Sequence, residues 1–374
     1  MNEQIRSLFP ALENYTYLNS AAVSPIPTTA VDAVLSQLRD VAHHGSEHYL
    51  EWIATKNRAR NLIASMLNVR DNQIAFTRNT SDGFASIASG IDWKPGDNVV
   101  SFAGEFPANF YPWRRIRDKY GVELRLCPER DGRIDLDEYT SLIDPNTKLV
   151  TISSVQFASG FSAELERIGD AARAVDALFA VDIIQGFGAR GYDLSGLGVD
   201  IAAGASHKWL CAPEGCGILF VSDKARELVD PTLTGWISVE TPWDFEDREQ
   251  PWKPNALAWE SGTGASALFY GLEQSLLLLN ETGLDIIERY LDELSGQLCE
   301  MLASKDYEIL SSRAPGERSA IVCIKHRGGL HCSEIASHLQ KANIIVSPRN
   351  DRLRIAPHFY NDLEDIERLV AELP

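Results

Sequence analysis

Helical and strand-like segments alternate along most of this sequence, and this alternation limits the fold more than any other feature. Seven short apolar segments have the composition of β-strands, at 74–76, 98–102, 123–127, 149–153, 178–181, 201–203 and 217–221. Segments with helical periodicity precede and separate them, at 31–41, 50–67, 84–91, 111–120, 168–177 and 224–228. Such alternation is typical of a mostly parallel sheet with helices on both faces. The sequence therefore predicts an α/β fold.

The pattern changes beyond about residue 230. Segment 235–254 is rich in proline, tryptophan and charged residues and lacks periodicity, as expected of a long ordered loop, which is usually functional. The elements expected after it are a long helix over 265–302, a strand at 320–324, a helix at 332–341, strands at 344–347 and 353–355, and a helix at 363–373 capped by Asn361. We expect them to form a second, smaller α+β domain.

A chain of 374 residues is too long for one simple core and suggests two domains. We expect an N-terminal arm over 1–20 that packs with the small domain. The large domain is expected over 21–262 and the small C-terminal domain over 263–374.

The composition excludes several classes of partner. The net charge of −18 and the isoelectric point near 4.9 argue against nucleic acid and against an anionic membrane. The sequence shows no secretory signal, and no apolar segment approaches the ~18 residues of a membrane span. The six cysteines are dispersed without a CxxC pair, so we expect reduced thiols, no metal site and a cytoplasmic protein.

A lysine and an aspartate follow two of the strand-like segments. Lys208 comes shortly after segment 199–203, and Asp182 directly follows segment 177–181. Alone, a lysine after a strand is usually a solvated loop residue, and an aspartate at a strand end usually caps a helix. As a pair they suit pyridoxal phosphate (PLP), because a lysine forms a Schiff base with its aldehyde and a carboxylate keeps its pyridine nitrogen protonated.

Hydroxyl groups stand where a phosphate could bind. Thr80 and Ser81 fall at the start of a helix, so their hydroxyls and the free backbone N–H groups would hold a phosphate; the alternative is that one of them caps the helix. Ser206 and His207 directly precede the lysine and add a further hydroxyl and an imidazole.

Two further side chains suit the cofactor ring and the substrate. Phe106 follows a strand and would lie flat on a pyridine ring, or else pack in the core. Arg354 interrupts an apolar strand and would bind a carboxylate with two hydrogen bonds, or else form a structural salt bridge.

In this order along the chain, the motifs resemble the class V aminotransferase family of fold-type I PLP-dependent enzymes, which includes cysteine desulfurases, kynureninases, isopenicillin-N epimerases and cystine lyases. The resemblance rests on Asn79-Thr80-Ser81, Phe106, Asp182 with Gln185, Ser206-His207-Lys208, segment 260–263 and Arg354. It spans nearly the whole chain, from segment 17–22 to the last helix.

The resemblance implies a role for each residue. Lys208 would carry the cofactor and, once substrate has released it, act as acid and base. The other implied roles are Asp182 at the pyridine N–H, Gln185 at the phenolic oxygen, Thr80, Ser81, Ser206 and His207 near the phosphate, Thr263 on the phosphate of a neighbouring subunit, Arg354 on the substrate α-carboxylate, and Asn19, Ala21 and Ala22 along the substrate's approach. A site shared between subunits implies a homodimer.

Departures from the family pattern narrow the reaction. Cysteine desulfurases place a histidine where Phe106 stands and a cysteine on a mobile loop before the carboxylate-binding arginine. Here segment 346–352 contains no cysteine, and a persulfide relay requires a thiolate. Phenylalanine cannot transfer protons, so Lys208 would do the acid–base work unaided.

We therefore expect a PLP-dependent enzyme acting on a small L-amino acid, with transamination narrowly ahead of C–S lyase or epimerase activity. Segment 235–254 and the histidines at 43, 44 and 48 are candidates for substrate selection. A dinucleotide-binding protein would carry a GxGxxG turn after a first strand, and none exists. The intact Lys208, Asp182 and Arg354 argue against a catalytically idle scaffold.

Overall fold

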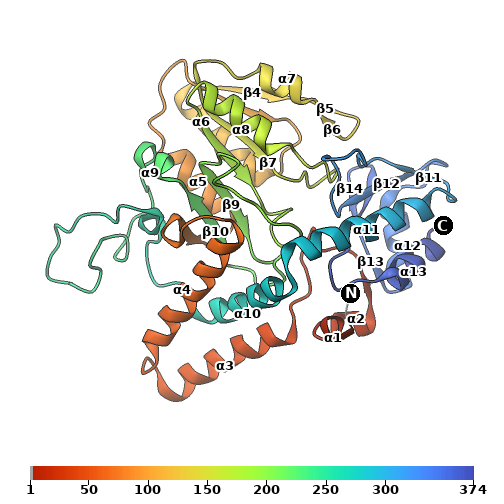
Figure 1. Cartoon of the computed structure of the whole chain (residues 1–374), viewed down its shortest axis with the longest axis horizontal. Helices are drawn as coiled ribbons and strands as arrows, with labels where there is room; N and C mark the ends of the chain where they lie inside the picture. The colour runs from red at the N-terminus through yellow and green to blue at the C-terminus, as the bar shows by residue number, and fades with distance from the viewer. Residues whose placement is uncertain (1–2) are drawn as a thin grey trace.

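The computed structural model describes residues 3–374 and has a seven-stranded sheet at its centre (Figure 1). The strands lie in the order β2-β10-β9-β8-β7-β3-β4, with bounds β2 Ile74–Thr77, β3 Asn98–Phe102, β4 Glu123–Cys127, β7 Thr147–Ser153, β8 Leu178–Asp182, β9 Ile201–Ala205 and β10 Gly217–Val221. Strand β10 is antiparallel to both neighbours, and the other pairs are parallel. The predicted α/β class with a mostly parallel seven-stranded sheet is confirmed.

Helices cover both faces of this sheet because successive residues of a strand point to opposite sides. In β8, Phe179 and Val181 belong to one apolar core, whereas Leu178 and Ala180 belong to another. The first core also takes in helices α4 (Tyr49–Met66), α8 (Leu165–Ala174) and α10 (Ser266–Thr282). The second takes in α5 (Thr80–Gly90) and α6 (Tyr111–Tyr120).

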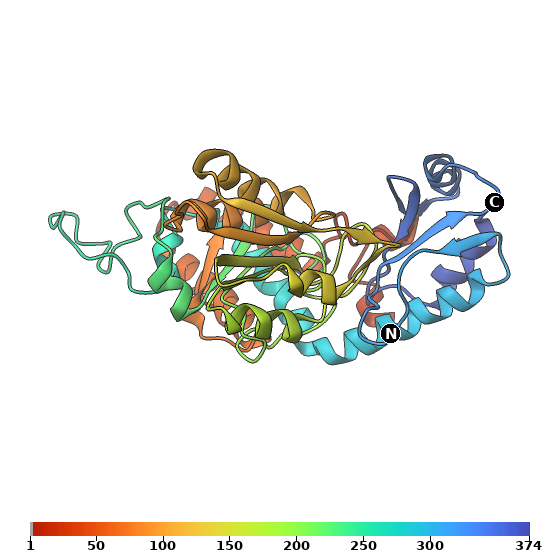
Figure 2. The same ribbon diagram turned by 90° about the horizontal axis from the view of Figure 1, so that it is seen from above.

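A four-stranded antiparallel sheet lies beside the first one (Figure 2). Its order is β11-β12-β15-β14, with bounds β11 Tyr307–Ile309, β12 Val322–His326, β14 Ser347–Arg349 and β15 Arg352–Ile355. Helices α11 (Leu284–Leu302), α12 (Cys332–Lys341) and α13 (Leu363–Glu372) pack on it around a third apolar core. The domain boundaries after residues 20 and 262 stay a prediction.

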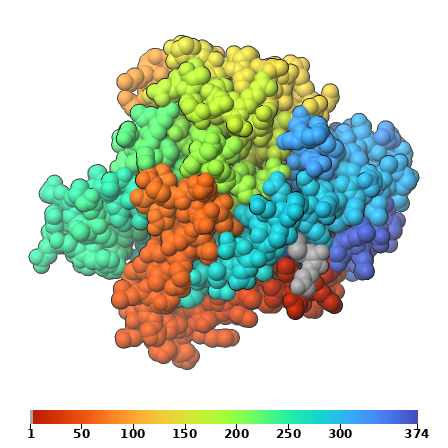
Figure 3. Space-filling model, viewed as in Figure 1, coloured from red at the N-terminus to blue at the C-terminus, as the bar shows by residue number. Residues whose placement is uncertain are grey.

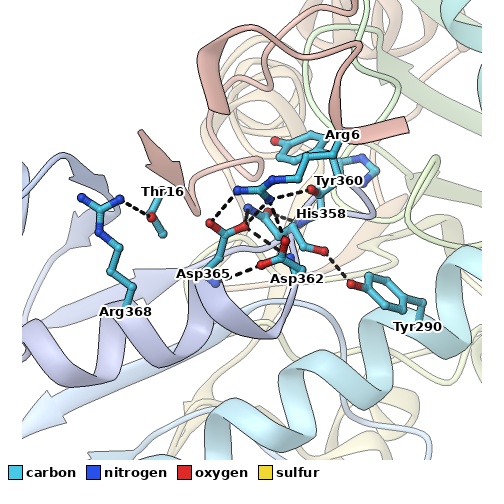
Figure 4. Close-up of polar contacts among 9 residues, drawn as sticks. Arg6, Thr16, Tyr290, His358, Tyr360, Asp362, Asp365 and Arg368 are labelled. Carbon is cyan, nitrogen blue, oxygen red and sulfur yellow. Dashed lines mark hydrogen bonds and ion pairs between the residues drawn. The ribbon is translucent and has the colours of Figure 1, made fainter. Parts of the chain in front are cut away.

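The N-terminal segment is attached to the C-terminal elements. It contains α1 (Glu3–Arg6), α2 (Ala11–Asn14) and β1 (Thr16–Tyr17), and β1 pairs in parallel with β13 (Ile344–Ile345). The guanidinium of Arg6 donates to the Asp365 carboxylate at 2.7 Å and to the Tyr360 carbonyl at 3.1 Å (Figure 4).

Two sequence predictions about helix ends are wrong. The expected helix over 265–302 is two helices, α10 and α11, because Gly283 between them adopts a positive φ of 86°. The residue that caps α13 is Asp362 rather than Asn361, since the Asp362 carboxylate accepts from the Asp365 N–H at 3.1 Å. The Asn361 side chain instead donates to the Asp365 carboxylate.

The loop over 235–254 projects from the large sheet (Figures 1 and 3). Trp243, Phe245 and Trp252 expose more than half of their surface there. The remaining elements are α3 (Thr28–His44), α7 (Leu136–Ser141), α9 (Asp223–Leu228) and the hairpin of β5 (Glu129–Arg130) and β6 (Arg133–Ile134). Between residues 3 and 374, none of the helices combines the length and the apolar character that crossing a bilayer requires.

Candidate active site

A cavity of about 300 Å³ lies where the carboxyl ends of several large-sheet strands meet the β14–β15 hairpin of the small sheet. Parallel strands bring the residues that follow them to one edge of a sheet, which is where α/β proteins bind ligands. Ten residues singled out from the sequence line this cavity: Ala21, Ala22, Thr80, Ser81, Phe106, Asp182, Gln185, His207, Lys208 and Arg354.

Asp182 and Lys208 are both buried in this cavity. One carboxylate oxygen of Asp182 accepts from the Ile184 N–H at 2.9 Å, while the other, Oδ2, is buried and has no partner among the described residues. Burial raises the pKa of Asp182, the charge of Glu105 adds to this, and the charge of Lys208 opposes it. Burial lowers the pKa of Lys208 to about 8; Asp182 opposes this, and Arg354 and Arg349 add to it.

The start of α5 presents unsatisfied donors to the cavity. The cap of this helix is Asn79, whose side chain accepts from the Asp82 N–H at 2.9 Å, so neither Thr80 nor Ser81 is the cap. The Thr80 hydroxyl is consequently buried without a partner among residues 3–374. The first backbone N–H groups of a helix also lack partners within the helix. With the half-buried His207 beside them, these groups fit a phosphate.

Gln185 is held in place by two hydrogen bonds. Its amide nitrogen donates to the Ala21 carbonyl at 3.0 Å, and its amide oxygen accepts from the Trp209 indole N–H at 3.0 Å. The amide nitrogen carries a second hydrogen, which remains for a ligand oxygen. The hydrogen bond to Ala21 also attaches the N-terminal segment to the cavity. A second attachment is the Ser24 N–H, which donates to the His207 carbonyl at 2.9 Å.

Arg354 reaches the cavity from β15 and is almost fully buried. Its Nη1 donates to the Phe157 carbonyl at 2.9 Å, and its Nε and Nη2 have no partner in the described chain. The alternative of a structural salt bridge is therefore wrong. Nε and Nη2 share one edge of the guanidinium plane, which is the edge that binds a carboxylate with two hydrogen bonds. Burial lowers the pKa of Arg354 to about 10, and the nearby Arg349 adds to this.

Phe106 lies at the cavity rather than in the core, and 38% of its surface is exposed. The Lys208 Nζ is 5.3 Å from the centre of its ring, and the ring of Phe157 packs edge-on against it at 5.1 Å. The preceding residue, Glu105, is fully buried and accepts hydrogen bonds from the Ser153 N–H at 2.7 Å and from the Gln156 amide at 2.8 Å. These bonds hold the turn that carries Phe106.

Three site residues that the sequence did not single out are Glu105, Phe157 and Arg349. Phe157 and Arg349 line the cavity, and Glu105 positions its neighbour. The one available signal was a glutamate between a small residue and Phe106 just after a buried strand. Nothing in the local sequence around Phe157 or Arg349 distinguishes them from other loop and edge-strand residues.

Several predicted site residues do not line the cavity. The Ser206 hydroxyl donates to the Pro213 carbonyl. Asn19 forms an isolated parallel β-bridge with Ala356, which directly follows β15. Thr263 lines a separate cavity of about 230 Å³ beneath the projecting loop. The Glu260 carboxylate that precedes it is buried and bonded to Arg60 at 2.6 Å.

The histidines at 43, 44 and 48 are exposed at the turn between α3 and α4, away from the cavity. His44 and His48 both contact the Asp40 carboxylate, at 2.9 and 2.7 Å. None of the described residues that line the cavity is a cysteine. Segment 346–352 contains β14 and its tight turn into β15. Cys323 is paired with Arg354 on the neighbouring strand β12, and its thiol donates to the Ala158 carbonyl. Burial raises the pKa of that thiol to about 11.

Comparisons with known proteins agree with this geometry. The sequence model of the family described as Aminotransferase class-V matches residues 16–369. A probable cysteine desulfurase of Methanothermobacter thermautotrophicus is 28% identical, covering 98% of this chain and 96% of its own. An uncharacterized aminotransferase of Bacillus subtilis is 26% identical, covering 99% of this chain and 97% of its own.

Solved structures share the fold. The apo cysteine desulfurase of Thermococcus onnurineus superposes with a TM-score of 0.90 at 24% identity, covering 99% of this chain and 96% of that one. A cystine C–S lyase in complex with cysteine persulfide superposes with a TM-score of 0.89 at 24% identity, covering 97% and 98%.

Proposed function

The chain belongs to the class-V aminotransferase family and is a PLP-dependent enzyme, and from this premise we propose that it transfers the amino group of a small L-amino acid. One observation carries the proposal: the cavity holds three sets of buried polar atoms without partners in the described chain. They are the Thr80 hydroxyl, the Asp182 Oδ2, and the Nε and Nη2 of Arg354. Buried polar atoms are normally satisfied, so unpaired ones in a cavity indicate a ligand.

The three sets match the polar parts of cofactor and substrate. The Asp182 oxygen would accept the pyridine N–H, and Thr80, Ser81 and His207 would hold the phosphate. Phe106 would lie against the ring, and Gln185 would donate to the phenolic oxygen. Arg354 would bind the substrate α-carboxylate. When bound, PLP supplies an aldehyde that condenses with amines and a ring that stabilises negative charge at the substrate α-carbon.

Lys208 would remove and return the proton. Because burial lowers its pKa to about 8, a useful fraction of the amine is neutral near neutral pH and can accept a proton. The pKa of His207 is also lowered, by burial first, but this side chain belongs to the phosphate end. Phe106 cannot exchange protons. A single base that moves one proton between two positions is sufficient for transamination, although racemisation and β-elimination begin with removal of the same α-proton.

A C–S lyase is the second candidate. It is favoured by the likeness to a cystine C–S lyase and to cysteine desulfurases, together with the absence of any cysteine among the residues that line the cavity. Without a thiol to receive sulfur, a sulfur-containing substrate would release it directly as sulfide or persulfide.

A single-turnover experiment separates the two. Holoenzyme mixed with an amino acid but no amino acceptor should yield one equivalent of 2-oxo acid per site and no free ammonia. Continuous release of pyruvate and ammonia, together with sulfide from cysteine or cysteine persulfide from cystine, would instead identify the lyase. Neither product from any small L-amino acid would refute both.

We also propose a homodimer with shared sites. Thr263 lies outside the cavity of its own chain, which accords with a role at the phosphate of a second subunit. Random mixing of equal amounts of inactive Lys208→Ala and Thr263→Ala subunits should restore about a quarter of the wild-type activity, because half of the dimers are mixed and each of these keeps one complete site of two. Failure of this complementation, or a monomer by light scattering, would refute sharing.

All six cysteines are free thiols, which accords with a cytoplasmic location.

A further inference from the structure

Arg349 is a second arginine at the substrate end of the cavity, and the proposed function leaves it without a role. We propose that Arg349 binds the side-chain carboxylate of a dicarboxylic substrate, an amino acid or 2-oxo acid of four or five carbons. This inference rests on the proposed function, in which Arg354 takes the α-carboxylate. It defines the substrate class of one half-reaction.

The hairpin places the two arginines on one face of the small sheet. In the β14–β15 pairing, Ser347 lies opposite Arg354 and Arg349 lies opposite Arg352. Residues two apart on a strand share a face, so Arg349 is the diagonal neighbour of Arg354. Diagonal neighbours stand about 7–8 Å apart at their backbones. Long side chains from such positions can reach both ends of one short dicarboxylate, and both line the same cavity.

Arg349 has no acidic partner in the described chain. Its Nη1 donates to the carbonyl of the adjacent Pro348 at 2.9 Å, and no carboxylate of residues 3–374 lies within ion-pair distance. Arg352, on the same hairpin, differs: it pairs with Glu129 at 3.4 Å and with Asp351 at 3.5 Å. Arg349 is about half-buried, and burial lowers its pKa. A partly desolvated cation without a counter-charge is unfavourable until a ligand anion supplies one.

The charged residues that line the cavity indicate where a ligand anion would bind. Among the described residues that line the cavity, the cations Lys208, Arg349 and Arg354 are accompanied by one carboxylate, that of Asp182. Both arginines lower the pKa of Lys208, whereas the pKa of His207, at the phosphate end, responds to Lys208 and Glu214 and to neither arginine. The two arginines therefore lie on the substrate side. Once an α-carboxylate neutralises Arg354, the charge of Arg349 remains for a second carboxylate.

Binding of unreactive acids to the holoenzyme tests the inference without turnover. Succinate and propionate differ by one terminal carboxylate, and calorimetry gives an affinity for each. Arg349→Gln should weaken succinate binding about 10- to 100-fold, the loss expected for a charged hydrogen bond, and change propionate binding less than twofold. Arg349→Lys should keep part of the succinate affinity. Arg352→Gln, on the same hairpin but paired with Glu129 and Asp351 and outside the cavity lining, should leave the succinate-to-propionate ratio unchanged.

Three results would overturn the inference. Equal losses for both acids would mean that the two arginines share one carboxylate. Unchanged succinate affinity in Arg349→Gln, with cofactor content and thermal unfolding like wild type, would remove the role. A wild-type enzyme that binds propionate as tightly as succinate would do the same. If the enzyme transaminates only monocarboxylic amino acids, the proposed function holds and this inference fails. If succinate binding depends on Arg349 but no amino acid is turned over, this inference holds and the proposed function fails.

Discussion

Replacing Arg354 by glutamine is expected to remove the α-carboxylate site while leaving the fold intact. Within the described chain the buried guanidinium makes one hydrogen bond, to the Phe157 carbonyl, and its Nε and Nη2 have no partners. A substrate carboxylate would fill that edge with two charged hydrogen bonds, each worth about 1.5–3 kcal/mol. Glutamine retains at most one donor and no charge.

The two hydrogen bonds together are therefore worth about 3–6 kcal/mol of binding free energy. The loss should lie near the lower value if the glutamine amide still donates to the carboxylate. In kcat/KM this corresponds to a decrease of roughly 10²- to 10⁴-fold. Most of it should appear in KM, because the carboxylate is held before and during the reaction alike. The thermal midpoint should move by less than about 3 °C, since the change removes one hydrogen bond together with two unsatisfied donors.

The assay compares kcat/KM for an amino acid with that for its α-carboxamide, which lacks the α-carboxylate charge. Wild type should prefer the acid by about the factor that the substitution costs, as one contact accounts for both effects. Arg354→Gln should not discriminate between them, and Arg352→Gln, on the same strand, should behave like wild type. A variant that still prefers the acid by the wild-type factor would refute the assignment of Arg354.

Three further predictions concern the cofactor end of the cavity. Lys208→Ala should abolish the borohydride-reducible cofactor linkage, seen by peptide mass spectrometry; a reduced adduct on another lysine would displace Lys208. In cofactor-free protein, where the pKa of Lys208 falls from 10.5 to about 8 on folding, the unfolded chain binds more protons between these values, so its contribution to stability rises with pH. Lys208→Met should therefore be more stable than wild type in urea at pH 7 by roughly 3 kcal/mol, with the difference closing towards pH 10; a pH-independent difference would contradict this. Thr80→Val should weaken PLP binding about tenfold in equilibrium dialysis without loss of stability, because the Thr80 hydroxyl has no partner among the described residues to lose, and Thr80→Ser should restore it; unchanged affinity would remove Thr80 from the site.

The sequence predicted the large sheet and most of the cavity because both depend on local patterns. Each strand of the sheet is a short apolar run, and residues at the ends of such strands meet at one edge whatever the details of packing. Asp182, Lys208 and Thr80 could be chosen on that basis. The cap of α5 could not, because Asn79, Thr80 and Ser81 are all plausible caps and the backbone decides among them.

The residues that escaped prediction depend on contacts between distant segments. Arg349 enters the cavity because the β14–β15 hairpin of the small sheet faces the large one, an arrangement with no local signature. Glu105 is buried through bonds to Ser153 and Gln156, about fifty residues away. The break at Gly283 was lost within a continuous apolar periodicity, which conceals a single left-handed residue.

The N-terminal segment leaves little slack between the two sheets. The Leu18 carbonyl accepts from the Ala356 N–H at 2.8 Å, and the Ser20 N–H donates to the Ala356 carbonyl at 3.1 Å, so this stretch belongs mechanically to the small sheet. The very next residue, Ala21, is bonded to Gln185 of the large one. A large rotation of the small sheet against the large sheet would have to break the hydrogen bonds that this segment makes to one of them. Because Ala21 directly follows the residues bonded to Ala356, we expect substrate exchange to involve little relative movement of the two sheets.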